Sequence, residues 1–163
     1  MLFFSLSALA NDLSTPVNIY IGHKKPPYII NYEKEIGLYF DLVKFINKEV
    51  NKGSTLYPFK IIYIPRKRLN RDLRSGNLDG LVLGANPIWY KDKSKTTYIW
   101  SPGIFKDKDV VISTSNDPFE YNTPQSFKDK VLVGVAGYYY QGVDELVSNK
   151  KIVRINVEDE SKL

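Results

Sequence analysis

The sequence of 163 residues lacks cysteine altogether and contains a single histidine, His23. Without cysteine there is no disulfide scaffold, no cysteine-based zinc or iron–sulfur site and no cysteine nucleophile. No Ser, Asp or second His is spaced to make His23 a general base, so we expect it to make a loop hydrogen bond or a contact at the edge of a cleft. We therefore expect neither an enzyme nor a bound metal or cofactor. Because lipoproteins carry their lipid on an N-terminal cysteine, we also expect no lipid anchor.

Long apolar runs are missing too, since none reaches the roughly 18 residues that a membrane-spanning helix needs. Hydrophobic residues make up 43% of the chain and charged residues 25%, which is typical of a globular protein. Aromatic residues, by contrast, are plentiful, because 12 Tyr, 8 Phe and 2 Trp bring their share to 13%. A core of this size needs fewer rings, so some are expected on a binding surface.

Residues 1–10 have features of an export signal. They form an apolar run that ends in Ala8-Leu9-Ala10, which fits the small-x-small pattern of a cleavage site. No Lys or Arg precedes the run, and a buried N-terminal strand or helix is the alternative interpretation. We predict cleavage after Ala10 and an exported chain.

The first part of the chain alternates between strand and helix patterns. In chain order the predicted elements are a strand over Val17–Gly22, a helix over Leu38–Val50, a strand over Phe59–Ile64, a basic helix over Arg66–Ser75 and a strand over Leu78–Leu83. This β-α-β-α-β order predicts a small parallel sheet covered by helices. Ligands of such sheets bind at the carboxyl ends of the strands, here followed by residues 23–32, 65–68 and 84–91.

The pattern then restarts without completing a second unit. The expected elements are a strand over Asp109–Ser113, a helical turn over 124–130, a strand over Val131–Val135, a helix over Gln141–Ser148, a strand over Ile152–Val157 and the first turn of a helix over Glu158–Leu163. The sequence therefore predicts an α/β fold whose second unit is incomplete.

Six short segments resemble the family 3 extracellular solute-binding proteins, which serve amino-acid uptake systems. In order, they are Ile19–Tyr28, Gly37–Leu42, Leu73–Asp79, Trp100-Ser101-Pro102, Ser126–Lys130 and Val133–Gly137. Each motif is weak alone, but six in order over nearly all of residues 11–163 are more specific.

The resemblance implies a periplasmic-binding-protein-like fold, in which two α/β lobes close around a ligand by a hinge motion. We expect lobe 1 over residues 11–105, then a hinge strand and an incomplete lobe 2 over residues 106–163, with the hinge near Phe105–Val111. The resemblance further implies a periplasmic monomer that binds a small polar solute, with an amino acid as one candidate. The protein would deliver this solute to the permease of a membrane ABC transporter. Nucleic acid is not an expected partner.

The resemblance also assigns ligand-binding positions. Arg66 falls where the family often has an aromatic residue that stacks on the ligand. Asn86 matches a short hydroxyl residue that binds the ligand carboxylate, and Lys91 lies about where an Arg pairs with that carboxylate. The Gly137–Tyr139 turn is expected to offer backbone N–H groups that open a helix. Lys is a point charge and lacks the planar, two-pronged guanidinium of Arg. Whether the site recognises an ordinary α-amino acid is therefore an open question.

Several aromatic residues are expected to line the same cleft. Trp89 follows a predicted strand end and can form an apolar floor or part of a cage for a cation, with a lid on the outside of lobe 1 as the alternative. Tyr138 and Tyr139 are the matching candidates on lobe 2, where at least one of three consecutive tyrosines is expected in the core. Tyr28 can close the cleft from lobe 1, whereas Tyr39 fits the buried face of its helix.

Three other functions are compatible with these patterns. An enzyme on the same fold, such as a dehydratase or the regulatory lobe of a cell-wall lyase, would need a positioned acid or base, for which only His23 and Lys91 are candidates. The chain could equally be the sensor lobe of a membrane receptor. The basic run from Arg66 to Arg74 is compatible with nucleic-acid binding, but a solvated helix face is the favoured interpretation.

Overall fold

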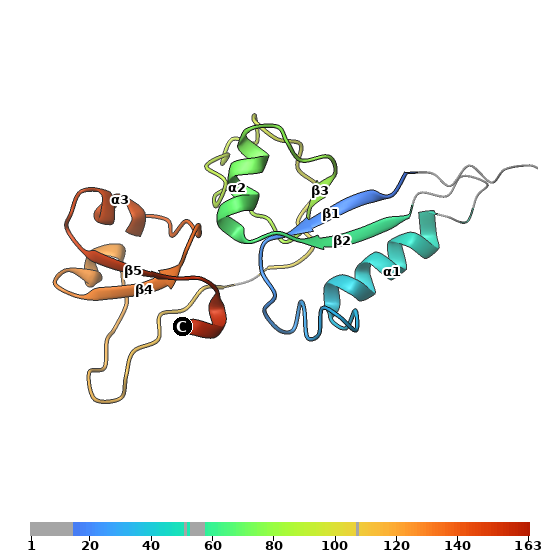
Figure 1. Cartoon of the computed structure of the whole chain (residues 1–163). Coiled ribbons are helices and arrows are strands. Elements are labelled where there is room, and N and C mark those ends of the chain that lie inside the picture. Colours follow the sequence, from blue (N-terminus) through green and yellow to red (C-terminus); the bar gives the residue numbers. More distant parts are fainter. Residues whose placement is uncertain (1–14, 51, 53–57, 107) are drawn as a thin grey trace, which may run out of the picture.

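The computed structural model describes residues 15–50, 52, 58–106 and 108–163, and the predicted export signal lies outside them. Two parallel sheets form the framework, one of three strands and one of two. Figure 1 shows them as separate α/β lobes joined by the irregular chain between β3 and β4. We call the lobe built on β1–β3 the first lobe and the lobe built on β4 and β5 the second. The predicted boundary between residues 105 and 106 remains a prediction.

The first sheet has the predicted β-α-β-α-β connectivity. Its strands are β1 (Val17–Ile21), β2 (Phe59–Tyr63) and β3 (Leu81–Val82), arranged in the order β2-β1-β3. All pairs are parallel, with Ile19 opposite both Ile61 and Leu81. The third strand is shorter than predicted, because only two of its residues pair with β1.

Two helices cover this sheet, α1 (Leu38–Val50) and α2 (Arg66–Arg74), and Figure 1 shows them on opposite sides of it. Tyr39, Phe40 and Val43 form the buried face of α1, which confirms Tyr39 as a core residue. Leu69 of α2 is fully buried. Burial of one such leucine contributes about 2 kcal/mol to the free energy of folding. Each helix therefore turns the face that carries its apolar residues toward the sheet.

The strand order places a topological switch point between β1 and β3. The chain leaves β1 for β2 on one side and later returns to β3 on the other, so the two connections diverge there. Crevices that bind ligands form at such points, outside the carboxyl ends of the strands. In this lobe the ends are Gly22 and His23 after β1 and Gly84 after β3.

The second lobe is smaller. It contains β4 (Val131–Val135) paired in parallel with β5 (Val153–Val157), helix α3 (Val143–Ser148) and two 3-10 turns, Pro124–Phe127 and Glu160–Lys162. Its core consists of Phe127, Val143 and Ile152. Four apolar side chains of the sheet remain exposed: Val131, Val133, Val153 and Ile155.

The predicted strand over Asp109–Ser113 is wrong. The described residues offer it no backbone partner, and its side chains are exposed, so its β-branched composition does not lead to a ladder. The predicted hinge over residues 105–111 overlaps this irregular segment. In the described parts of the chain we find no helix with the length and apolar character needed to cross a bilayer.

We predict that Gly84→Ala destabilises the first lobe because of a steric clash. A Cβ at Gly84 would lie 2.1 Å from the Tyr39 hydroxyl, and the backbone there has a φ of +70°. Gly76 has nearly the same φ, +71°, but open space around it. The positive φ alone should cost about 1 kcal/mol in Gly76→Ala, and the clash should add about 1–3 kcal/mol in Gly84→Ala.

Denaturant unfolding of both variants measures this difference. Tyr39→Phe, which removes the hydroxyl, should recover part of the loss when combined with Gly84→Ala. Equal free energies of unfolding for the two alanine variants would contradict the packing described here.

Candidate functional site

A cleft of about 1070 Å³ lies where the carboxyl ends of β1 and β3 face the second lobe. Six of the eight predicted ligand-binding residues line it, namely Tyr28, Arg66, Asn86, Trp89, Tyr138 and Tyr139. A side groove of about 620 Å³ shares Trp89, Tyr138 and Tyr139 with the cleft and adds the other two, Lys91 and Gly137. The structure thus brings all eight positions together around two adjoining hollows.

Arg66 is the most buried charged side chain of the cleft, with 6% of its surface exposed. Its guanidinium carbon lies 4.6 Å from the ring centre of Tyr90, 5.3 Å from that of Tyr138 and 5.7 Å from that of Trp89. Two of these rings come from the first lobe and one from the second. The cationic group therefore lies where the lobes meet, within cation–π distance of all three rings.

The loop after β3 begins with a turn built by Asn86. The Ile88 N–H donates to the Asn86 side-chain oxygen at 2.9 Å, and the Trp89 N–H donates to its carbonyl at 3.0 Å. Asn86 thereby shapes the loop that presents Trp89 to the cleft. Its predicted contact with a ligand carboxylate remains a prediction.

Asp92 holds the rest of this loop in place. Its carboxylate accepts hydrogen bonds from the N–H groups of Thr96, Thr97 and Tyr98 and from the indole nitrogen of Trp100 at 2.8 Å. These bonds favour the ionised form, so the pKa of Asp92 lies well below its ordinary value. Four donors on one carboxylate therefore fix the backbone of this loop.

The aromatic wall is a cluster of three rings, Tyr90, Tyr98 and Trp100. Their ring centres lie 6.2–6.5 Å apart in tilted or edge-on arrangements. Burial raises the pKa of the Tyr90 hydroxyl, which has no hydrogen-bond partner in the described part of the chain. None of the three was a predicted ligand contact, although Tyr90 lies in residues 84–91, which follow a predicted strand end.

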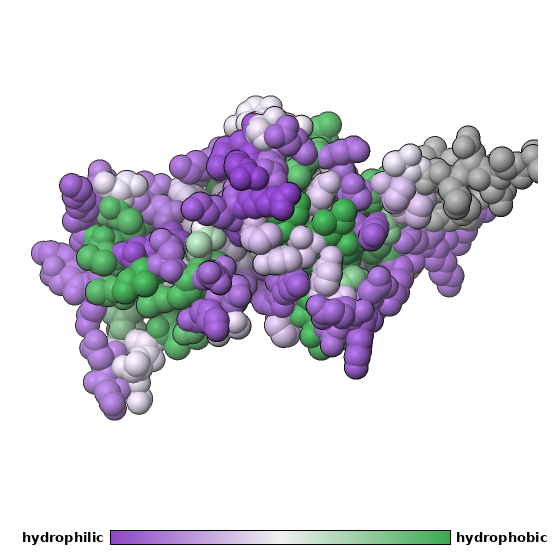
Figure 2. Space-filling view, in the orientation of Figure 1, coloured by the Kyte–Doolittle hydropathy of each residue, from purple (hydrophilic) through white to green (hydrophobic). Residues whose placement is uncertain are grey.

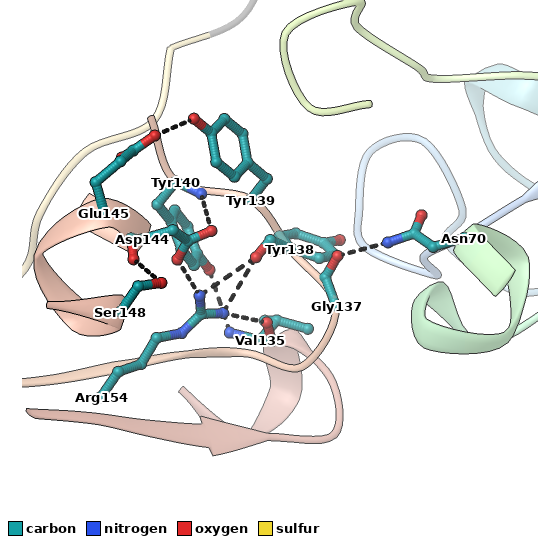
Figure 3. Close-up of polar contacts among 10 residues, drawn as sticks. All are labelled: Asn70, Val135, Gly137, Tyr138, Tyr139, Tyr140, Asp144, Glu145, Ser148 and Arg154. Carbon is teal, nitrogen blue, oxygen red and sulfur yellow. Dashed lines mark hydrogen bonds and ion pairs between the residues drawn. The ribbon is translucent and has the colours of Figure 1, made fainter. Parts of the chain in front are cut away.

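On the second lobe, Arg154 organises the turn that follows β4 (Figure 3). Its guanidinium pairs with Asp144 at 2.6 Å and donates to the carbonyls of Val135 at 2.7 Å and Tyr138 at 3.3 Å. The Tyr140 ring lies 4.7 Å from its guanidinium carbon and packs against the second core. As predicted, one of the three consecutive tyrosines packs against the core, although Tyr140 is only partly buried and also lines the cleft.

The prediction that the Gly137–Tyr139 turn opens a helix is wrong. Helix α3 begins only at Val143, and the Tyr138 N–H already donates to the Val135 carbonyl. The turn therefore owes its place to side-chain bonds from Arg154 and Asp144, and not to a helix N-terminus.

Tyr138 and Tyr139 are each tied to a glutamate. The Tyr138 hydroxyl donates to Glu160, and burial together with this bond raises its pKa strongly. The Tyr139 hydroxyl donates to Glu145 at 2.6 Å, which raises its pKa to about 12. Both phenols are therefore neutral at physiological pH, and both rings are held in fixed positions at the cleft.

The two lobes touch at three further points. Asn70 of α2 donates from its side-chain amide to the Gly137 carbonyl at 2.8 Å, as Figure 3 shows. A Cβ on Gly137 would lie 3.0 Å from the Lys67 nitrogen, so glycine permits this close approach. Lys91 is exposed, and its ammonium lies 5.5 Å from the centre of the Tyr139 ring. Asn70 was not among the predicted site residues.

Tyr28 closes the cleft from the first lobe. Its ring stacks on Phe105 at 5.3 Å and lies 5.1 Å from Tyr39. His23 is buried beside them, with its Nε2 3.3 Å from the Tyr39 hydroxyl, so the expected loop hydrogen bond is confirmed. The sequence analysis named Phe105 as the start of the predicted hinge, but not as a contact of Tyr28 at the cleft.

Positive charge predominates around the cleft and the side groove. Two acidic residues line them, Asp109 and Asp144, of which Asp144 is paired with Arg154. The basic residues that line them are Lys25, Arg66, Lys67, Arg74, Lys91 and Lys95. Within the described ranges no three His, Cys, Asp or Glu side chains come together as a metal site.

The basic run of α2 divides into two kinds of residue. Arg68 and Arg71 are exposed and pair with Asp72, so the solvated-face interpretation holds for them. Arg66, on the same helix, is buried in the cleft instead. Figure 2 shows the hydrophilic surface that α2 presents to solvent.

We predict that Asp92→Asn changes the response of the Trp100 loop to acid. Because the folded pKa lies below the free value of 3.8, the ionised carboxylate stabilises the loop above that pH and loses this effect as the pH falls. The Asn variant should be less stable near neutral pH and should show a flatter acid profile. Acid titration followed by Trp fluorescence measures this, with exposed Asp117→Asn as the control. Identical profiles for wild type and Asp92→Asn would contradict this role.

We also predict that Arg154→Met destabilises the second lobe by about 3 kcal/mol, because Asp144 and two carbonyls lose their donor. Lys130→Met is the matched control, since it breaks the exposed Lys130–Asp117 pair and should cost less than about 1 kcal/mol. Denaturant unfolding gives the free energies, and amide hydrogen exchange locates the loss to residues 131–157. An Arg154→Met variant that is as stable as Lys130→Met would refute this structural role of Arg154.

No protein-family model matches the sequence, and a comparison with curated proteins found no match. Among solved structures, the chain is similar to a mutant of ArgBP from T. maritima, with a TM-score of 0.65 and 16% identity. The match covers 90% of this chain and 61% of that one. At this identity the likeness shows the fold alone: the chain has the mixed α/β, periplasmic-binding-protein-like architecture over part of the neighbour's length.

Proposed function

We propose that this chain belongs to a solute-binding protein that holds a small polar solute in the cleft between its lobes. The observation that carries the proposal is the convergence of the eight positions from both lobes around the cleft and its side groove. The cleft lies at the switch point of the first sheet, where α/β proteins bind ligands. Its volume of about 1070 Å³ is slightly above the usual range of about 300–1,000 Å³ for small-molecule pockets.

The similar ArgBP structure supports the same function, since that protein is an arginine-binding protein. By analogy, the chain would act outside the cytoplasm as a monomer and deliver its solute to a transporter permease. The apolar segment at residues 1–10 supports export. An amino acid is one class of solute to test.

The structure offers little support for an enzyme on this fold. Catalysis would need a positioned acid or base, for which the sequence offered His23 and Lys91. His23 is buried against Tyr39, and Lys91 is exposed above the Tyr139 ring. Both groups serve packing contacts in the described structure, so binding without chemistry is the function we propose.

Solute binding is tested by titrating the chain with the twenty L-amino acids, succinate and putrescine. Trp89 lines the cleft, so a bound solute should change Trp fluorescence, and calorimetry gives an independent readout. Tyr138→Ala should weaken binding at least about tenfold because it removes the ring that the second lobe places over Arg66 in the cleft. Tyr121→Ala, an exposed tyrosine of the second lobe, is the matched control and should bind like wild type.

A folded chain that shows neither fluorescence change nor heat with any of these solutes would overturn the proposal. If Tyr138→Ala binds the solute as tightly as Tyr121→Ala does, the Tyr138 ring is not part of the site and binding occurs elsewhere.

A further inference from the structure

Arg66 is buried, and none of the described residues gives it an acidic partner. The ion pairs within the described residues involve other cations, and the two arginines beside it on α2 share Asp72. Its Nε is shielded from solvent and donates no hydrogen bond to any described atom. A shielded donor of a charged group is costly when it has no acceptor, because it has lost water without gaining a hydrogen bond.

The three aromatic rings compensate only part of this cost. Cation–π contacts act on the faces of the guanidinium, whereas its five N–H donors point outward in the plane of the group. Trp89, Tyr90 and Tyr138 lie within 4.6–5.7 Å of its carbon, but none supplies a carboxylate or carbonyl acceptor to it. Because no acceptor is found among the described residues, a ligand could supply one.

The surroundings favour an anion as that acceptor. Six Lys or Arg and only two Asp line the cleft and side groove. The first turn of α2, which begins at Arg66, contains no acidic residue, so the positive end of the helix dipole is not offset there. Gly22 at the end of β1 leaves room for the side chain, since a Cβ there would lie 3.0 Å from the Arg66 Cδ.

We propose, on the basis of the proposed solute-binding function, that Arg66 anchors a carboxylate of the solute. The planar fork of Arg binds a carboxylate through two parallel hydrogen bonds, which an ammonium cannot do. Exposed Lys91 is then a peripheral charge. Because Trp89, Tyr90 and Tyr138 surround Arg66 itself, they do not form a cage for a cationic group of the solute.

The position of Tyr138 suggests how the solute reaches this anchor. Tyr138 belongs to the second lobe, whereas Trp89 and Tyr90 belong to the first. Separation of the lobes would remove one ring and uncover the guanidinium, and closure would return the ring over the bound carboxylate.

The first test needs no variant. Each L-amino acid that binds wild-type protein in the panel is compared with its own α-carboxamide, and succinate with succinamide. The acids should bind about 100-fold more tightly than the amides, as expected when one partner of a buried charged pair is lost. Amides that bind as tightly as their acids would overturn the anchor while leaving the solute-binding proposal intact.

The second test compares variants of two arginines on one helix. Arg66→Gln should weaken binding of the same acids about 100-fold, and Arg66→Lys should restore only part of the loss. Arg68→Gln removes the same charge from the solvent face of α2 and should bind within about twofold of wild type. Circular dichroism and thermal unfolding establish that each variant is folded.

The outcomes separate the two proposals. If Arg66→Gln and Arg68→Gln bind the acids equally well, the anchor is refuted although the cleft still binds solute. If only putrescine or another cation binds, solute binding stands and the carboxylate anchor falls. If nothing in the panel binds wild-type protein, both proposals fail together.

Discussion

The contact between the Arg66 guanidinium and rings from both lobes is the interaction on which the site depends. Trp89 and Tyr90 reach it from the loop after β3, and Tyr138 reaches it from the turn after β4. Asn86 shapes the loop that presents Trp89, Asp92 holds the Trp100 ring next to Tyr90, and Arg154 donates to the Tyr138 carbonyl on the second lobe. One cation therefore links two separately braced aromatic surfaces, and it does so without an acidic partner among the described residues.

Much of the framework could be predicted from the sequence. The apolar spacing of Leu38–Val50 gave the bounds of α1, and the predicted strands Val17–Gly22 and Val131–Val135 match β1 and β4 to within a residue. Short-range periodicity suffices for these elements, because each has an apolar face that must meet a sheet or helix. The parallel order also predicted that the strand ends of the first lobe meet, whereas the eight predicted ligand-binding positions came from the family resemblance, and the structure gathers them around the cleft and its side groove.

The remainder depends on contacts that a single sequence does not encode locally. Asp109–Ser113 has strand propensity but lacks a partner in the described structure, and pairing is decided by other segments. The family resemblance marked Arg66 as a ligand-binding position, but no local pattern indicated that Arg66, unlike Arg68 and Arg71, is buried beneath Tyr138, more than seventy residues away. Asp92 gains its role from four donors brought to it by the loop fold, and the Gly137 turn is held by Arg154.

A crystal structure of the chain with the tightest-binding carboxylate of the panel tests the central claim most directly. The account predicts a carboxylate of the solute at about 3 Å from two nitrogens of the Arg66 guanidinium, with the Tyr138 ring still over the group. A solute bound away from Arg66, or an Arg66 side chain paired with a carboxylate of the protein itself, would contradict it.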